Sequence, residues 1–241
     1  MKLKVLITLF ALILPIICFA SSSTVASGII SSPCVIGSSA ARSGFWTWPA
    51  GSQVNVYLRE PDFSAQAFAA VATAVANWDA AAVDNGSHVH FSFHGATREL
   101  KTAPGDLTVI RGDVYDKHTK HLALLQAHSL HSNLLIDYAV IVVDLTVSTS
   151  AVLTNVMAHE IGHSLGLLDC YKCSRGTTAM GLLRTATETN GIEGPSACDN
   201  SAVAAAYREL ALRVSSLPAA ISVDEGEDPE ADNTPLVKRP R

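Results

Sequence analysis

Residues 159 to 169 read His-Glu-Ile-Gly-His-Ser-Leu-Gly-Leu-Leu-Asp, and this run is the most informative part of the chain. On a helix, His159 and His163 project from the same face, because four residues make just over one turn. Two neutral imidazoles placed in this way can occupy two corners of a tetrahedral zinc site. Glu160 lies about 100° further round the helix, where it can reach a water on the metal without ligating the metal. The pattern is typical of a metal-activated hydrolase.

The residues that follow the second histidine extend this pattern. Gly166 comes three residues after His163, where a helix can end and the chain can turn with φ > 0. Asp169 follows three residues later, so the returning chain can present a third ligand. Met180 lies within Thr-Thr-Ala-Met-Gly. A methionine alone is usually a gap-filling core residue, and histidines can be ordinary helix residues, but the agreement of several spaced features favours a metal site.

In these residues the chain resembles the metzincin metallopeptidases, whose motif is His-Glu-x-x-His-x-x-Gly-x-x-His followed by a methionine turn. The third ligand position holds Asp169 instead of histidine, as in the snapalysin-like branch. The resemblance is dense over residues 134–182 and topological over the remainder of 45–215. It implies an α+β, zincin-like catalytic domain with a five-stranded mixed sheet, a backing helix, an active-site helix and a small C-terminal subdomain with one helix. Met180 would form a hydrophobic floor beneath the metal.

The spacing of apolar residues predicts where the secondary structure lies. Alternating or continuous apolar runs predict strands at 54–58, 89–93, 107–111, 122–126 and 138–143. A stripe at spacings of three and four predicts a helix that Ser64 caps and that ends near Ala82. A second helix, capped within 148–150, holds the metal motif, and a third is expected over 201–214.

The N-terminal residues predict that the protein is exported, and composition divides the rest of the chain. Lys2 and Lys4 precede an apolar run, and residues 1–20 have the features of a secretory signal peptide with cleavage after Ala20. Residues 21–44 are expected to be a flexible N-terminal segment, 45–217 the catalytic domain, and 218–241 a disordered acidic and basic tail. The apolar run is short for a membrane anchor, so we expect no anchor. The protein is expected to be secreted, to a periplasm or to the medium, and to be a monomer.

Charge and motif content narrow the class of partner. Removal of Lys2 and Lys4 with the signal peptide takes the net charge from −5 to −7, which argues against nucleic acid or anionic membranes as partners. The sequence has no Gly-rich phosphate loop and no G-x-S-x-G nucleophile motif. The expected partner is therefore a protein or peptide substrate.

Four cysteines remain after signal cleavage: Cys34, Cys170, Cys173 and Cys198. An even number in an exported protein favours two disulfides and leaves three connectivities open. The metzincin resemblance favours Cys173 with Cys198, around the methionine turn, and so Cys34 with Cys170. Two other interpretations stay open. The C-x-x-C of Cys170 and Cys173 would bind a second zinc ion, as in archaemetzincins, or Cys34 would cover the catalytic zinc as a latency switch.

Other histidines lie close together in the sequence. His88, His90 and His94 would share one face of the second strand, but only His88 and His90 would be near enough to bind one ion, and no carboxylate partner is evident. A further set flanks the expected fourth strand at the rim of the cleft: His118, His121, His128 and His131. We interpret both sets mainly as surface residues.

The resemblance implies a secreted zinc endopeptidase with Zn²⁺ held by His159, His163 and Asp169. Zinc would lower the pKa of its water towards about 7, and Glu160 would act as the general base and return the proton to the leaving amine. With one carboxylate among the ligands, the metal–ligand set carries +1, which implies a weaker Lewis acid than a site with three histidines. The alternatives are a catalytically silent zinc-binding or adhesion module and a metal hydrolase of cell-wall peptides.

Overall fold

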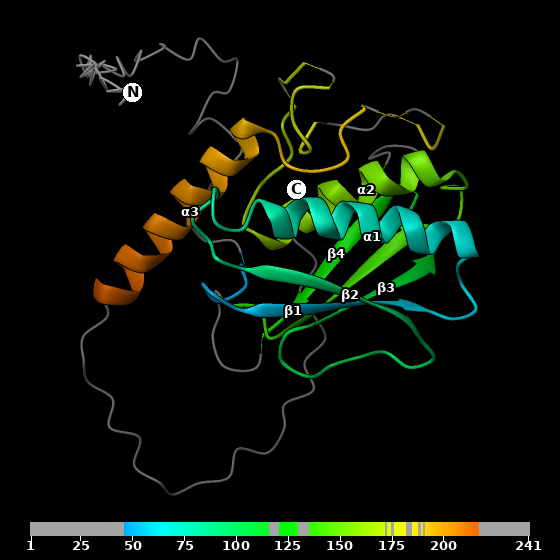
Figure 1. The fold of residues 1–241 in the computed structure, drawn as a ribbon, viewed down its shortest axis with the longest axis horizontal. Coiled ribbons are helices and arrows are strands. Elements are labelled where there is room, and N and C mark those ends of the chain that lie inside the picture. The colour runs from blue at the N-terminus through cyan, green and yellow to red at the C-terminus, as the bar shows by residue number, and fades with distance from the viewer. Residues whose placement is uncertain are drawn as a thin grey trace, which may run out of the picture. The chain divides into compact units, whose positions relative to one another are not determined.

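The computed structural model describes residues 46–115, 121–129, 135–171, 173–174, 176–181, 185–187, 189 and 191–216. The elements follow one another as β1 (Gln53–Arg59), α1 (Ala65–Ala80), β2 (His90–Thr97), β3 (Asp106–Gly112), β4 (Ala123–His128), β5 (Tyr138–Asp144), α2 (Ser150–Ser164) and α3 (Ala197–Ser216) (Figure 1). The expected signal peptide, the segment 21–44, the tail 218–241 and the residues Cys34, His118 and His131 lie outside the described residues.

Each strand and helix expected from the apolar pattern is present, with its ends moved by a few residues. Thr149 caps α2, because its hydroxyl accepts the Val152 N–H at 3.3 Å. Ser64 occupies the N-cap position of α1 but makes no side-chain capping bond. α3 starts at Ala197, earlier than the expected position 201. The α+β class and the five-stranded mixed sheet are therefore confirmed.

The sheet has the strand order β2-β1-β3-β5-β4. Neighbouring strands are parallel except β4, which pairs antiparallel with β5, so that Ala123 lies opposite Val143 and His128 opposite Tyr138. Among the described residues β4 therefore forms one edge of the sheet, and the backbone groups on its outer side have no partner strand there.

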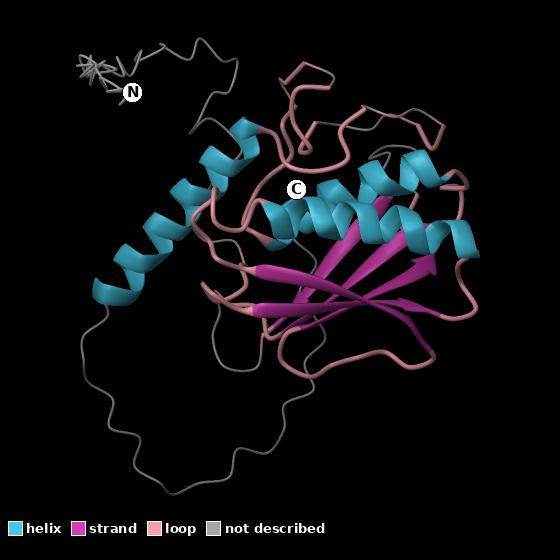
Figure 2. Cartoon of the chain, viewed as in Figure 1, coloured by secondary structure: helices cyan, strands magenta, loops and turns pink. Residues whose placement is uncertain are grey.

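Helices α1 and α2 lie side by side over one face of the sheet (Figure 2). The interface between the two helices and the sheet is the main core, to which α1 contributes Val71 and Trp78 and α2 contributes Met157 and Ile161. The indole N–H of Trp78 donates to the Ala158 carbonyl at 2.8 Å, and Trp78 is fully buried. This bond joins α1 to α2 one residue before His159.

The segment before β1 holds the C-terminal end of α2. Thr47 forms backbone bridges with both Leu135 and Leu165, and the Trp48 N–H donates to the Ser164 carbonyl at 3.3 Å. From α3, the Tyr207 hydroxyl donates to the Trp48 carbonyl at 3.0 Å. The point where α2 ends, and where the expected ligand loop starts, is therefore fixed by contacts from two distant parts of the chain.

Helices that meet the length and hydrophobicity needed to span a membrane are absent from the part of the chain that the structure describes.

The two buried tryptophans allow the α1–α2 hydrogen bond to be measured. Trp48 and Trp78 are both fully buried, but the indole nitrogen of Trp48 has no hydrogen-bond partner among the described residues. Replacing either by phenylalanine removes similar apolar contact, whereas only Trp78→Phe loses a hydrogen bond. We expect Trp78→Phe to lower the free energy of unfolding, measured in urea, by about 1 kcal/mol or more beyond the effect of Trp48→Phe. Equal losses in the two variants would contradict this assignment.

Candidate metal centre

The two histidines of the motif face each other across one turn of α2. Their Nε2 atoms are 3.1 Å apart, and the ring planes are nearly perpendicular, at 87°. The sequence-based prediction that His159 and His163 share one face of a helix is therefore confirmed.

Backbone carbonyls set the orientation of both rings. The Nδ1 atom of His159 lies 2.9 Å from the Ala179 carbonyl oxygen, and the Nδ1 atom of His163 lies 2.8 Å from that of Leu167. A carbonyl oxygen can only accept, so each Nδ1 carries a proton and donates it. The Nε2 atoms are then the positions that can ligate a metal, as is usual for histidines that have such backbone partners.

The loop after α2 brings Asp169 to the same point. Gly166 has φ 86°, and the Gly166 and Leu167 N–H groups donate to carbonyls in the last turn of the helix, at 3.0 and 3.1 Å. The chain therefore reverses where the sequence predicted a left-handed glycine. The Asp169 Oδ1 atom lies 3.0 Å from the Nε2 atom of His159 and 3.5 Å from that of His163.

The three atoms are spaced as ligands of a single metal ion would be. Ligands about 2.0–2.1 Å from a tetrahedral zinc lie roughly 3.3 Å from one another. The observed separations of the two Nε2 atoms and Oδ1 are 3.0, 3.1 and 3.5 Å. A carboxylate oxygen of Glu160 lies within 4.8 Å of a ligand nitrogen on each of the two histidines. Glu160 is buried, at 5% exposure. His159, Glu160 and His163 form a group able to hold a metal ion.

Charge and hydrogen bonds act between the side chains of this site. Burial lowers the pKa of His159, but the hydrogen bond to Asp169 and the charges of Glu160 and Asp169 outweigh this effect and raise the pKa to about 9. Burial raises the pKa of Asp169, yet hydrogen bonds and charge from both imidazoles hold it well below its usual range. The three potential ligands therefore interact with one another through hydrogen bonds and charge.

Met180 packs against α2. Met180 is fully buried, and a Cβ placed on Gly162 would overlap its sulfur. Its carbonyl oxygen accepts the Cys170 N–H at 2.8 Å, and Cys170 forms a backbone bridge with Gly181. The methionine loop therefore lies directly against the ligand helix and beside the loop that carries Asp169.

The preferred disulfide pairing from the sequence is wrong. Cys170 and Cys173 are bonded to each other, so neither can pair with Cys198 or Cys34. A turn in which the Cys173 N–H donates to the Cys170 carbonyl, at 3.4 Å, places their Cα atoms 5.4 Å apart, a usual distance for a disulfide. This bond also contradicts a second zinc on the C-x-x-C, because ligation needs free thiolates. Cys198 is disulfide-bonded as well.

Two residues of the site were not found from the sequence. The exposed Tyr171 donates its hydroxyl to the Asp169 Oδ2 atom at 3.1 Å, and the charge of Asp169, followed by burial, raises the Tyr171 pKa. Asp199, in the first turn of α3, bonds to the loop before Met180. No pattern pointed to Tyr171. Asp199 has a signal, since Ser196-Ala-Cys-Asp199 is a capping-box sequence.

The other histidines are separate from this centre. His88 lies outside β2 with φ 53°, so the prediction of three same-face histidines is wrong. His90 does have a carboxylate partner, Asp79, at 3.0 Å, contrary to expectation. His128 stacks on Tyr138 at 4.4 Å between ring centroids. Within the described residues, neither set joins a metal-binding group.

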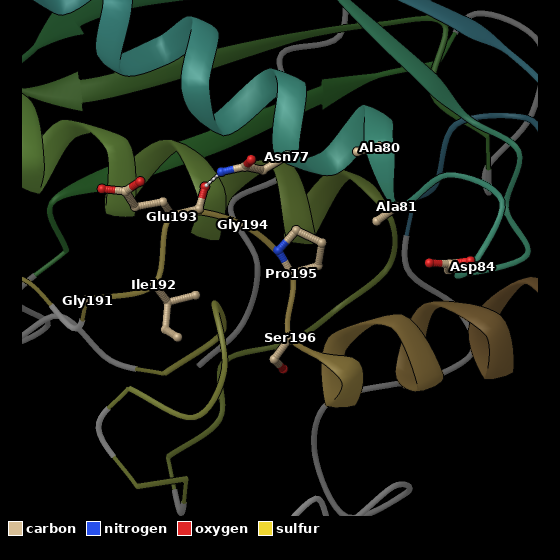
Figure 3. Close-up of a pocket in the computed structure, with 10 residues that line it drawn as sticks. All are labelled: Asn77, Ala80, Ala81, Asp84, Gly191, Ile192, Glu193, Gly194, Pro195 and Ser196. Atoms are coloured by element: carbon tan, nitrogen blue, oxygen red, sulfur yellow. Dashed lines mark hydrogen bonds between the residues drawn. The ribbon is translucent and has the colours of Figure 1, made fainter.

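A pocket of about 440 Å³ lies where α1 meets the segment 191–196 (Figure 3). The side-chain amide of Asn77 donates to the Glu193 carbonyl at 2.9 Å, and Gly194 lies so close to Asn77 that a Cβ on the glycine would overlap it. None of the residues that line this pocket belongs to the metal-binding group. The pocket is therefore distinct from the candidate metal centre.

Comparison of the chain with protein-family models and with curated proteins finds no match.

The turn at Gly166 yields a prediction about metal binding. Alanine at Gly166 would be strained by φ 86°, and its Cβ would lie 2.8 Å from the Thr47 methyl group. Gly51 has a similar φ of 77° but no atom within 4 Å, so Gly51→Ala is a matched control for backbone strain. We expect Gly166→Ala to weaken zinc binding in a competition titration, whereas Gly51→Ala keeps the parental affinity. Parental affinity in both would show that the turn does not position Asp169.

Proposed function

We propose that this protein is a zinc-dependent endopeptidase. The observation that carries the proposal is the convergence of the His159 and His163 Nε2 atoms and the Asp169 Oδ1 atom within 3.5 Å of one another, with Glu160 buried beside them. A purely structural zinc site usually has four protein ligands. Three protein ligands with an adjacent carboxylate suit a site at which a water reacts.

His159, His163 and Asp169 would hold the metal. Zinc bound there would supply Lewis acidity, which polarises a substrate carbonyl and acidifies the attacking water. The carbonyls of Ala179 and Leu167 keep both imidazoles in the orientation that ligation requires. The three ligand atoms lie within 3.5 Å of one another, at separations that suit a single ion.

Glu160 would move the proton. The water oxygen forms a bond to the scissile carbonyl carbon, and Glu160 takes the proton that the water loses. When the carbon–nitrogen bond breaks, Glu160 returns this proton to the departing amine. The neighbouring position of Glu160 on α2 places its carboxylate near both histidine ligand atoms. Its charge also raises the pKa of His159, so only the loss of turnover in Glu160 variants separates a catalytic role from an electrostatic one.

The edge strand β4 supports a peptide as the substrate class. Within the part of the chain that the structure describes, its outer backbone N–H and C=O groups have no partner strand, so an extended peptide could add to the sheet there. Leu124 and Gln126 on this strand are exposed and alternate with less exposed neighbours. Main-chain bonding along β4 would hold substrates of varied sequence, which fits an endopeptidase.

Export from the cell is part of the same proposal. The sequence features of residues 1–20 indicate a secretory signal. The disulfide between Cys170 and Cys173 supports an oxidising compartment, because such bonds seldom persist in the cytosol.

The decisive test combines metal analysis with peptide-library cleavage. We expect the parent chain to bind one zinc ion and cleave peptides, and Glu160→Gln and Glu160→Ala to retain zinc while the rate constant falls by about 10²–10⁴-fold. Glu99→Gln, at an exposed glutamate outside this group, is the control and should keep the parental rate. Undiminished cleavage by either Glu160 variant would refute the mechanism, and cleavage of cell-wall peptides alone would redirect the substrate class.

The charge of the third ligand should be visible in the pH dependence of the rate. Asp169 leaves the metal–ligand set one unit less positive than a third histidine would, so the attacking water is acidified less. In Asp169→His that retains zinc, we expect the acidic limb of the pH profile of kcat/KM to move to lower pH. The profile is compared with that of the parent at equal metal content. An unmoved acidic limb would rule out this role for the Asp169 charge.

A further inference from the structure

Asp199 makes a set of bonds that helix capping does not explain. It lies in the first turn of α3 and is buried at 2% exposure. Its Oδ2 atom accepts the Ser196 N–H at 2.8 Å, while the Asp199 N–H donates to the Ser196 hydroxyl oxygen at 3.2 Å. These two bonds form a capping box. The remaining contacts of the carboxylate go to the loop that precedes Met180.

Those contacts hold three successive residues of the loop. The Ala179 N–H donates to Asp199 Oδ2 at 2.9 Å, and the Thr178 hydroxyl donates to Oδ1. Because the Thr178 hydroxyl gives its proton to Asp199, its oxygen is free to accept the Met180 N–H, at 3.0 Å. The Ser196 hydroxyl also donates to Oδ2, at 2.8 Å. All four groups that approach the carboxylate are donors, so both of its oxygen atoms have hydrogen-bond partners.

The loop held in this way contacts the metal centre at three points. The Ala179 carbonyl accepts the Nδ1 proton of His159, at 2.9 Å. The Met180 carbonyl accepts the N–H of Cys170, the residue after Asp169, at 2.8 Å. The Met180 side chain packs against Gly162, the residue before His163. Each potential ligand is therefore in contact with this loop directly or through its neighbour in sequence.

We propose that Asp199 is a positioning residue of the metal centre: its buried carboxylate fixes residues 178–180 and thereby sets the orientation of the His159 imidazole. This inference rests on the proposed function, because it assigns Asp199 to the same zinc site. It links the start of α3 to the ligand geometry, so α3 contributes to metal binding without contacting the metal.

A matched pair of variants separates positioning from general stability. Asp144 is also a buried carboxylate, at 1% exposure, and it accepts the N–H groups of Val114, Tyr115 and Thr146 at 3.0, 2.7 and 2.8 Å. It precedes α2, whose ligands lie near the opposite end, roughly 14 Å along the helix axis from its first residue. Both Asp199→Asn and Asp144→Asn leave a shape-matched amide that faces donors.

The measurements are zinc affinity by chelator competition, the visible spectrum of the Co²⁺-loaded chain, and the Nδ1–H resonance of His159. We expect Asp199→Asn to weaken zinc binding by roughly tenfold or more, in the range seen when the groups that orient metal ligands are changed. Its Co²⁺ spectrum and His159 resonance should also shift. Asp144→Asn should leave all three at parental values, even where urea unfolding shows a comparable loss of stability.

Variants at Thr178 keep the inference testable if Asp199→Asn does not fold. Thr178→Val removes the hydroxyl that joins Asp199 to the Met180 N–H, and should weaken zinc binding, whereas Thr178→Ser should restore the parental affinity. Parental zinc affinity in Asp199→Asn or in Thr178→Val would overturn the positioning role and leave the proposed function standing. A parent chain that binds no zinc would overturn the proposed function, and this inference with it.

Discussion

Helix α2 packs its apolar residues into the core and also contains the polar residues His159 and Glu160. Met157 and Ile161 are fully buried, and the helix contacts α1 through the bond from Trp78 to the Ala158 carbonyl. His159 and Glu160 follow directly on this apolar stretch. Burying such groups costs free energy unless each has hydrogen-bond or charge partners. The surrounding loops supply these hydrogen-bond and charge partners.

The partners come from backbone carbonyls that two loops deliver to α2. The loop at Gly166 places the Leu167 carbonyl against His163, and the loop before Met180 places the Ala179 carbonyl against His159. Each loop is held by a residue whose side chain or conformation leaves few alternatives: Gly166 with φ 86°, and Asp199 with its four donors. The orientation of the two imidazoles therefore depends on a glycine just after the second histidine and on an aspartate that is remote in sequence.

How much could be predicted from the sequence depends on the range of the interactions. The strands and helices were predictable because their apolar periodicity is local, and so was the turn at Gly166. Pairing of cysteines was not, because the tight turn that joins Cys170 to Cys173 depends on the local path of the chain after Asp169. His88 could not be placed, because its φ of 53° breaks the alternation that a strand would give. Tyr171 has no sequence signal at all.

The ion pair between His159 and Asp169 has a consequence for metal uptake. With the pKa of His159 raised to about 9, the ring carries a proton on each nitrogen at neutral pH in the metal-free chain. The Nδ1 proton stays on the Ala179 carbonyl, but the Nε2 proton has to leave before a metal can bind there. The same attraction that keeps the ligands together thus competes with the metal as pH falls below about 9. A metal that binds the Nε2 atom of His159 should therefore bind more weakly as the pH falls.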